Sequence, residues 1–204
     1  MIMKSIYSSE LSDFMEIYSA NVELVCISPP DSDIQALSYK FIESKKYFNL
    51  SWIMTTESDK SSENALREVI NPVLRSNLFN YIQISSNLLG KILGCNKFQV
   101  RLDKIGSPMC PLFHIDRISC RLLITLCGEG TEWISNSDVD WDIFSDRKNK
   151  CIPIKNGRFI NKFKVGQWSL LKGSVWGNNY NGVVHRSPNK IGNRLLLSLD
   201  PIFD

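Results

Sequence analysis

Two histidines are all that this chain contains, and they constrain its fold and chemistry more than any other feature. His114 stands two residues before Asp116 in the segment CPLFHID, and His185 lies far downstream. In an extended strand, residues two apart point to the same face, so His114 and Asp116 can approach one ion together. His185 has to reach them from a strand that pairs back across the fold. Because two histidines and one carboxylate are the donor set of many mononuclear metal sites, we predict that His114, Asp116 and His185 share one metal.

Length and composition are those of one globular domain, with 204 residues, 43% hydrophobic and 22% charged. The net charge of +3 comes from scattered basic residues, which speaks against a nucleic-acid partner. No segment approaches the ~20 apolar residues that span a bilayer, and residues 1–18 lack the apolar core of a signal peptide. We therefore expect a cytoplasmic protein with no membrane partner.

The six cysteines are expected to be reduced in that compartment. None of them forms a C-x-x-C pair, so a structural zinc site is not expected. Cys110, Cys120 and Cys127 flank the H-x-D segment. For Cys110 a ligand or redox role stays open beside the simpler interpretation of a small packed side chain.

The first half of the chain carries helical periodicity. Apolar residues recur at helical spacing in residues 9–19, 31–46, 64–70 and 73–93. Pro72 separates the last two segments, and Gly94 is a typical helix-ending residue. Residues 22–27 and 50–54 are expected to be extended. We predict that residues 1–97 form a mainly helical supporting layer.

From Phe98 the period changes to two, which predicts strands. Extended segments are expected at 98–102, 120–127, 131–133, 168–172 and 194–199, and residues 134–150 are expected to be irregular. Asn156-Gly157 predicts a hairpin between 151–155 and 158–163. The Gly- and Asn-rich residues 173–182 fit a pocket lid and a plain surface connection equally. We predict a single α+β domain over 1–204, in which residues 98–204 form a jelly-roll, or double-stranded β-helix, around the metal site.

The last predicted strand has two unlike faces. Arg194, Leu196 and Ser198 share one face, and three leucines share the other. If the first face lines the barrel, Arg194 places a guanidinium inside it, and a buried guanidinium needs an anion. Arg121 and Arg186 compete for that role but are expected to form structural ion pairs. Candidate pocket walls are Trp133, Trp168, Trp176 and Tyr180.

His114-x-Asp116, then His185, then Arg194 on an apolar strand resembles the Fe(II)/2-oxoglutarate dioxygenase superfamily, nearest to its prolyl-hydroxylase-like branch. The blocks CPLFHID, CRLLITLCGEGTEW, LLKG, VVHRSP and RLLLSLD resemble a bacterial family of domains of unknown function across residues 98–201. The wider resemblance implies Fe(II) on the triad and 2-oxoglutarate as cosubstrate, with hydroxylation of an unidentified small molecule or peptide. It implies that Arg194 binds the distal carboxylate, with Ser198 and Arg121 as further candidates for the cosubstrate site. The superfamily often has a small or hydroxyl residue where this chain has Leu196.

Three alternatives remain at this point. The triad can hold Fe or Zn in a non-catalytic module for metal homeostasis, or in a cupin-like metalloprotein that uses no 2-oxoglutarate. A purely structural protein is the third, and the ligand spacing speaks against it. Arg194 speaks against the storage module, because such a site has no use for a buried anion receptor.

Overall fold

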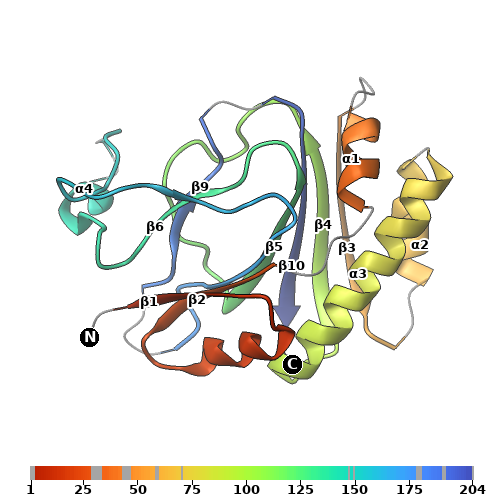
Figure 1. The fold of residues 1–204 in the computed structure, drawn as a ribbon, viewed down its shortest axis with the longest axis horizontal. Helices are drawn as coiled ribbons and strands as arrows, with labels where there is room; N and C mark the ends of the chain where they lie inside the picture. The colour runs from red at the N-terminus through yellow and green to blue at the C-terminus, as the bar shows by residue number, and fades with distance from the viewer. Residues whose placement is uncertain are drawn as a thin grey trace.

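The computed structural model describes residues 3–28, 34–42, 47–57, 60–69, 71–146, 148, 150–177, 181–189 and 192–203. Its strands form a seven-stranded sheet in the order β1-β2-β8-β5-β10-β4-β3 and a three-stranded sheet in the order β7-β6-β9. Every pairing is antiparallel except that of β1 with β2. Helices α1, α2 and α3 lie on one side of the large sheet, and the small sheet lies on the other (Figure 1).

The strands of the large sheet are β1 (Lys4–Ser8), β2 (Val22–Ile27), β3 (Phe48–Thr55), β4 (Lys97–Ile105), β5 (Cys120–Cys127), β8 (Trp168–Lys172) and β10 (Arg194–Ile202). The small sheet contains β6 (Glu132–Ile134), β7 (Asn161–Lys162) and β9 (Val184–Arg186). The helices are η1 (Leu11–Tyr18), α1 (Ile34–Ile42), α2 (Lys60–Ala65), η2 (Leu66–Glu68), α3 (Pro72–Leu93) and α4 (Trp141–Ser145), where η marks a 3-10 helix.

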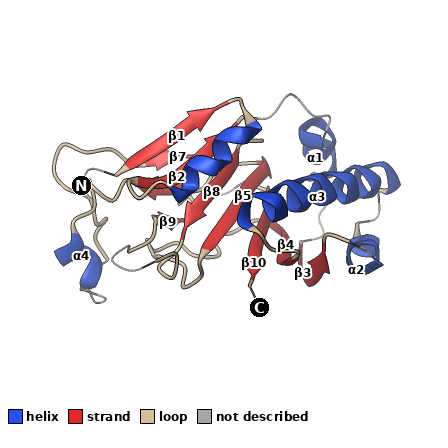
Figure 2. Ribbon diagram, turned by 90° about the horizontal axis from the view of Figure 1, so that it is seen from below, coloured by secondary structure: helices blue, strands red, loops and turns tan. Residues whose placement is uncertain are grey.

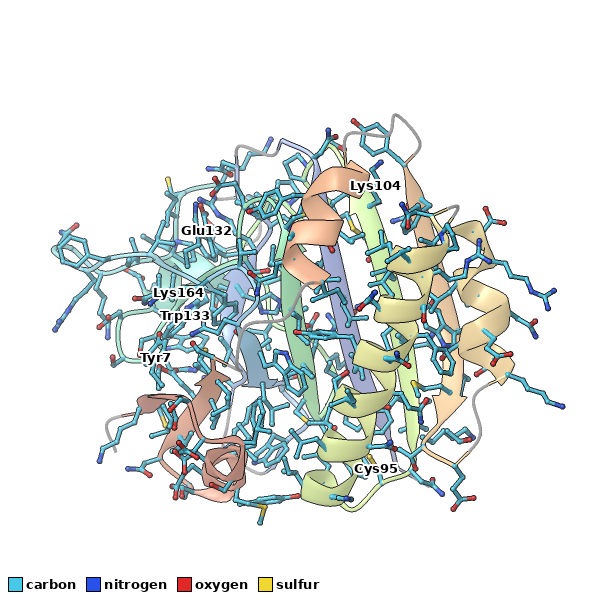
Figure 3. All side chains as sticks on the ribbon, turned by 45° about the vertical axis from the view of Figure 1, so that its right-hand side comes forward. Tyr7, Cys95, Lys104, Glu132, Trp133 and Lys164 are labelled. Atoms are coloured by element: carbon cyan, nitrogen blue, oxygen red, sulfur yellow. The ribbon has the colours of Figure 1, made fainter. Side chains whose placement is uncertain are left out.

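Alternation along the central strands separates a helix-facing core from a cavity on the opposite face. On β10, Leu195, Leu197 and Leu199 belong to the core, whereas Arg194, Leu196 and Ser198 line the cavity. Strand β5 repeats this division, as its sequence pattern predicts, with Leu122, Ile124 and Leu126 in the core and Arg121 and Leu123 at the cavity. In Figure 3, Glu132 and Trp133 lie on the side of the small sheet, and Lys104 and Cys95 lie at opposite ends of the helix-covered side.

The longest helix, α3, begins and ends at residues that suit those positions. The Asn71 side chain accepts a hydrogen bond from the backbone N–H of Leu74 at 2.9 Å, and Pro72 follows it in the first turn. Gly94 ends the helix in the left-handed conformation, with φ at +67°. The helix lies lengthwise over the sheet with α1 beside it (Figure 2). Among the described helices, none is long and apolar enough to cross a membrane.

The first half of the chain supplies strands as well as helices. The predicted extended segments 22–27 and 50–54 correspond to β2 and β3. Strand β1 is an additional strand that the sequence pattern did not predict. Residues 11–18 form a 3-10 helix instead of an α-helix. Within the predicted helix 31–46, residues 34–42 form α1. Residues 31–33 and 43–46 lie outside the described residues. The predicted helix 64–70 is wrong in its bounds: α2 starts at Lys60, and the 3-10 helix η2 follows it.

Two predictions for residues 134–163 are wrong. Asn156-Gly157 does form a turn, closed by a hydrogen bond from the Arg158 N–H to the Lys155 carbonyl, but its flanks do not pair as a hairpin. Ile154 bridges Val139 instead, and β7 pairs with β6, so tertiary partners override the local turn signal. The region 134–150 was expected to be irregular but contains α4. Asp140 starts this helix by accepting from the Ile143 N–H at 3.1 Å.

The H-x-D segment is not a strand, contrary to expectation. Its only ladder contact in the described structure is one isolated antiparallel bridge between His114 and His185. After Asp116 the chain leaves this bridge, because the carbonyls of Asp116 and Ile118 accept hydrogen bonds from Ser174 and Val175. The segment therefore fastens to two different parts of the chain within a few residues.

We predict that Gly94→Ala lowers the free energy of unfolding by about 1–2 kcal/mol, because an alanine at φ +67° meets its own backbone. No neighbouring atom lies within 4 Å of the added methyl, so conformation alone sets the effect. Urea unfolding would measure it. Gly192→Ala is the control, because its added methyl also has open space and its φ lies outside the left-handed region. Equal effects of the two substitutions would contradict the prediction.

Candidate metal centre

The two histidines face each other across a backbone pair. The His114 N–H donates to the His185 carbonyl at 2.9 Å, and the His185 N–H donates to the His114 carbonyl at 2.9 Å. Directly opposed residues of an antiparallel pair project their side chains to the same face. The imidazole centroids are consequently 4.5 Å apart. Strand β6 supports this arrangement from the other side of β9, where Trp133 pairs with His185.

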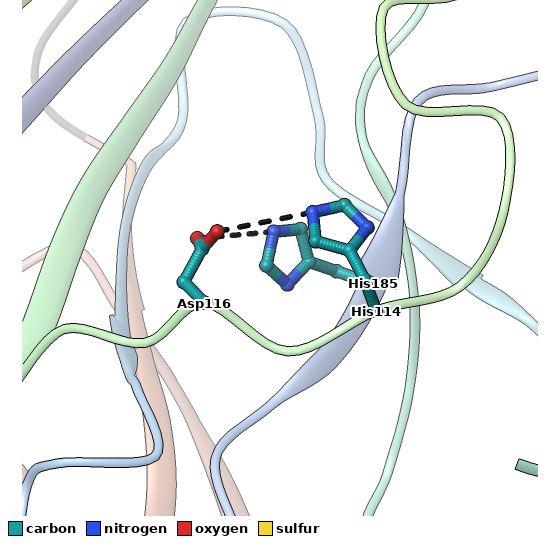
Figure 4. A group of neighbouring side chains, drawn as sticks. All are labelled: His114, Asp116 and His185. Carbon is teal, nitrogen blue, oxygen red and sulfur yellow. Dashed lines mark ion pairs between the residues drawn. The ribbon is translucent and has the colours of Figure 1, made fainter. Parts of the chain in front are cut away.

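Asp116 completes the group from two residues beyond His114. Its Oδ2 lies 3.3 Å from Nε2 of His185, and its Oδ1 lies 3.8 Å from Nε2 of His114 (Figure 4). One ligand atom from each residue lies within 4.8 Å of the others. Ligand atoms that each lie about 2.1 Å from one ion are about 3 Å from one another. A small movement of the three side chains toward one another would therefore let all of them bind a single metal.

Both imidazoles are held by their second nitrogen. Nδ1 of His114 contacts the Leu112 carbonyl at 3.0 Å, and Nδ1 of His185 contacts the Val183 carbonyl at 3.0 Å. Because a carbonyl can only accept, each Nδ1 carries a proton, and in the neutral ring Nε2 then has a free lone pair. Burial, together with the neighbouring His185, lowers the pKa of His114 and so favours the neutral form that binds a metal.

Arg121 connects the Asp116 carboxylate to a second carboxylate. Its Nη1 donates to Oδ2 of Asp116 at 2.6 Å, while its Nε and Nη2 donate to the two oxygens of Asp200 at 2.6 Å each. Burial alone would raise the pKa of Asp116. The hydrogen bond and charge of His185 in its protonated, metal-free form, together with the charge of Arg121, outweigh it, and the pKa lies well below its usual range. Asp116 is therefore ionised at neutral pH. Arg121 forms the ion pair that its sequence context predicted.

Arg194 is buried without a carboxylate partner. Its side chain is among the largest fully buried ones, and Nη2 donates to the hydroxyls of Thr131 at 2.7 Å and Thr125 at 3.2 Å. Its Nε is buried and has no hydrogen-bond partner in the described part of the chain. Among the described residues, no carboxylate lies within 4.0 Å of this guanidinium. Burial lowers the pKa of Arg194 to about 10, against the opposing charges of Asp103 and Glu129.

One cavity of ≈ 170 Å³ joins Arg194 to the three candidate ligands. Ser198 also lines it and accepts a hydrogen bond from Nε of Arg101 at 3.4 Å. The cavity wall is formed by Arg101, Asp103, Met109, Cys110, His114, Asp116, Arg121, Leu123, Thr131, His185, Arg186, Ser187, Arg194, Leu196 and Ser198. The sequence-predicted residues His114, Asp116, His185, Arg194, Ser198 and Arg121 thus share one space.

Other sequence candidates lie elsewhere. Trp168 belongs to the helix-facing core, and Trp133 stacks on Phe163 on the other side of the sheet. Trp176 packs against Tyr18, and Tyr180 lies outside the described residues. None of the three described tryptophans lines the cavity. Large aromatic side chains were therefore a poor signal for the pocket wall.

The other candidates close to the triad have simple roles. Arg186 donates from Nε to Glu132 at 2.8 Å, which is the ion pair that was predicted. Its guanidinium also lies over the Phe113 ring, 4.3 Å from the ring centroid. Cys110 lines the cavity but does not belong to the group of residues able to share a metal with the triad, and Cys120 and Cys127 are buried.

Sequence reasoning missed the residues that support Asp116. Asp200 anchors Arg121, and Ser174 donates from both its N–H and its hydroxyl to the Asp116 carbonyl. Gly173 lies so close to this segment that an added Cβ would be 2.2 Å from the Ile118 carbonyl oxygen. The described part of the 173–182 loop therefore braces the ligand segment. The signal that could have found it is a glycine where two backbones approach closely.

Comparisons with known proteins place this geometry in context. A family profile described as "Protein of unknown function (DUF1826)" matches residues 8–200. No curated protein matches the sequence. Among solved structures, dioxygenase for auxin oxidation 1 from Arabidopsis thaliana, in complex with 2-oxoglutarate, is similar with a TM-score of 0.62 and 13% identity, over 100% of this chain and 93% of that one.

Two further structures have the same character. The dioxygenase for auxin oxidation of rice has a TM-score of 0.58 at 13% identity, over 98% of this chain and 83% of that one. A full-length Neurospora crassa protein, solved in complex with alpha-KG, has a TM-score of 0.52 at 13% identity, over 98% of this chain and 84% of that one. These likenesses show a shared fold: a mixed α+β chain built on a large sheet.

We predict that the protein binds one divalent transition metal and that His114→Ala, Asp116→Ala and His185→Ala each weaken binding severely. Each loss should exceed the roughly 10–100-fold that removal of a group supporting a ligand typically brings. Cys110→Ser is the control at the same cavity and should keep wild-type affinity. Competition with a chromophoric chelator would measure the affinities. Wild-type affinity in two of the three alanine variants, or a cobalt(II) spectrum with sulfur charge-transfer bands, would refute the assignment.

Proposed function

This chain belongs to the DUF1826 family of proteins of unknown function, and we propose that it is a non-haem iron(II) oxygenase with 2-oxoglutarate as cosubstrate. The single observation that carries the proposal is the shared cavity. It brings a His-Asp-His group together with a buried guanidinium that has no carboxylate partner among the described residues. A metal accounts for the first feature, and an anionic ligand beside the metal would account for the second.

The donor set fits iron(II). Two imidazole nitrogens and one carboxylate oxygen are the facial arrangement that leaves coordination positions open for other ligands. His114 and His185 present Nε2, because their Nδ1 atoms donate to carbonyls. Asp116 presents a carboxylate that hydrogen bonding and charge keep ionised in spite of its burial. A closed structural zinc site would instead need a fourth protein ligand, and no described residue joins the group.

The surroundings of Arg194 fit the distal carboxylate of 2-oxoglutarate. A guanidinium presents donors in a planar fork that matches a carboxylate, and Nε of Arg194 is a buried donor without a partner. The hydroxyls of Thr125 and Thr131 hold Nη2 and so fix the orientation of the fork. Two of the similar structures were solved with this ligand, which supports the choice. Ser198, further along β10, lies within the same cavity.

In the proposed reaction, bound iron(II), 2-oxoglutarate and dioxygen supply the oxidising chemistry that hydroxylates a substrate and releases succinate and CO2. The residues of this chain bind and orient. Arg194 fixes one end of the cosubstrate, and the two histidines and Asp116 set the position of the metal. Leu123 and Leu196 add apolar surface to the cavity lining, which would disfavour water beside the cosubstrate.

The proposal includes the architecture. The similar folds and the two facing sheets support a double-stranded β-helix with the site between its sheets. Residues 1–204 would form one domain, because β1, β2 and β3 of the first half share a sheet with the strands of the second. The substrate would be a small molecule or a peptide that enters the cavity beside Met109 and Cys110, which lie at its exposed side.

We predict that Arg194→Ala weakens 2-oxoglutarate binding to the metal-loaded protein by roughly 30-fold or more, since loss of one partner of a desolvated charge pair costs about 2–5 kcal/mol. Metal affinity should change little, because the guanidinium donates only to the two threonines. Arg194→Lys should recover part of the loss, because a point charge cannot form the two-pronged contact. Isothermal calorimetry would measure both affinities.

Arg158→Ala is the matched control. It also removes an arginine, but Arg158 is exposed and pairs with Asp138 away from the cavity. If 2-oxoglutarate fails to bind the wild-type, metal-loaded protein at millimolar concentration, the oxygenase proposal fails. A metal-binding module would then be the better description.

A further inference from the structure

Arg121 differs from Arg194 in how fully its guanidinium is used. Nη1 contacts Asp116, and Nε and Nη2 contact both oxygens of Asp200, all at 2.6 Å. The three side chains are nearly buried, at 13%, 17% and 13% exposure. Each of its three nitrogens donates to a carboxylate of the protein. Three of its five N–H groups therefore serve carboxylates of the protein, which speaks against the cosubstrate role that the family resemblance implied for Arg121.

The contact with Asp116 is selective for one oxygen. Oδ2 lies 2.6 Å from Nη1 of Arg121 and 3.3 Å from Nε2 of His185. Oδ1 faces Nε2 of His114 at 3.8 Å and contacts no arginine among the described residues. Charge-assisted hydrogen bonds of this length are among the stronger ones in proteins. Arg121 thus distinguishes the two oxygens of Asp116: its hydrogen bond competes with a metal ion for Oδ2, and no arginine among the described residues competes for Oδ1.

The anchor of Arg121 is rigid for topological reasons. Arg121 is the second residue of β5, and Asp200 lies on β10, its hydrogen-bonded neighbour in the sheet. Asp200 is paired on its other side with Gln99 of β4. A two-pronged contact to a residue in the middle of three strands fixes the plane of the guanidinium, and with it the direction of Nη1.

We propose that Arg121 is a positioning residue that makes Asp116 a one-oxygen ligand and so keeps the metal site open. This inference rests on one part of the proposed function, namely that His114, Asp116 and His185 bind a metal. A carboxylate that binds through both oxygens occupies two positions on an octahedral ion, and one that binds through a single oxygen occupies one. With Oδ2 held by Arg121, the triad fills three positions, and three stay available to cosubstrates.

Positioning and plain electrostatics predict opposite outcomes. A guanidinium beside the site repels a divalent cation, so if Arg121 acted only as a charge, its removal would tighten metal binding. If Arg121 orients Asp116, its removal weakens metal binding despite the lost repulsion. Groups that hydrogen-bond a metal ligand typically contribute about 10–100-fold to metal affinity.

The test uses cobalt(II) alone, as an air-stable probe of the site, with the full-length chain and without 2-oxoglutarate. Arg121→Met is expected to weaken cobalt(II) binding about 10–100-fold. Arg121→Lys, which keeps the charge but loses the fork, should fall between Arg121→Met and the wild type. Arg158→Met is the control, because it removes an arginine from the exposed ion pair with Asp138 and should leave the affinity unchanged.

A second readout reports the carboxylate directly. The infrared difference spectrum between cobalt-loaded and metal-free protein isolates the carboxylate stretches that change on binding. The wild type should show the wide separation of antisymmetric and symmetric stretches that one-oxygen binding produces. In Arg121→Met the freed Oδ2 can also reach the metal, and the separation should narrow. A role of Arg121 in folding alone would not move this separation.

Arg121→Met removes the shortest ion pairs of two nearly buried carboxylates and can unfold the chain, so Asp200→Asn is the second variant. It keeps the shape of Asp200 and one acceptor oxygen, but it loosens the anchor of Arg121 and should give a smaller change in the same direction. Wild-type or tighter affinity with an unchanged infrared separation, in whichever of these variants folds, would overturn the inference and leave the proposed function intact. Failure of the wild type to bind cobalt(II) would overturn the metal site itself.

Discussion

The site depends on one backbone pair. Two hydrogen bonds between His114 and His185 join segments that are far apart in the sequence, and they place both imidazoles on one face. Without this pair the chain would carry two isolated histidines. The carbonyls of Leu112 and Val183 then fix both rings through Nδ1 in the same way. Asp116 needs only to follow two residues later to bring its carboxylate to both Nε2 atoms.

The arginines that line the cavity pair with carboxylates of the protein, except Arg194 among the described residues. Arg186 pairs with Glu132, and Arg121 with Asp116 and Asp200. Arg194 is buried more deeply than these, yet it donates only to two hydroxyls. A buried charge without a partner is costly, and it persists where a ligand supplies the partner. The same cavity thus holds the arginine that we propose binds a cosubstrate and the arginine that we propose positions a metal ligand.

Sequence patterns predicted the parts of the site that depend on residue type and alternation. The scarcity of histidine singled out His114 and His185, and period-two alternation on β10 placed Arg194 on the cavity face, as the structure shows. The bridge in place of a strand at His114, the failed hairpin at Asn156-Gly157 and the anchoring of Arg121 by Asp200 all depend on which strands become neighbours. A local sequence pattern does not show which strand will be its neighbour, because the pairing segment lies far away in the chain.

The most direct test of the central account is an anaerobic titration of the purified protein with iron(II), followed by 2-oxoglutarate, under visible absorption spectroscopy. Chelation of the metal by the cosubstrate gives a weak charge-transfer band that neither component gives alone. We predict that the band appears with wild-type protein, saturates at one iron per chain, and is lost in His185→Ala. Iron binding without any band on addition of 2-oxoglutarate would contradict the account.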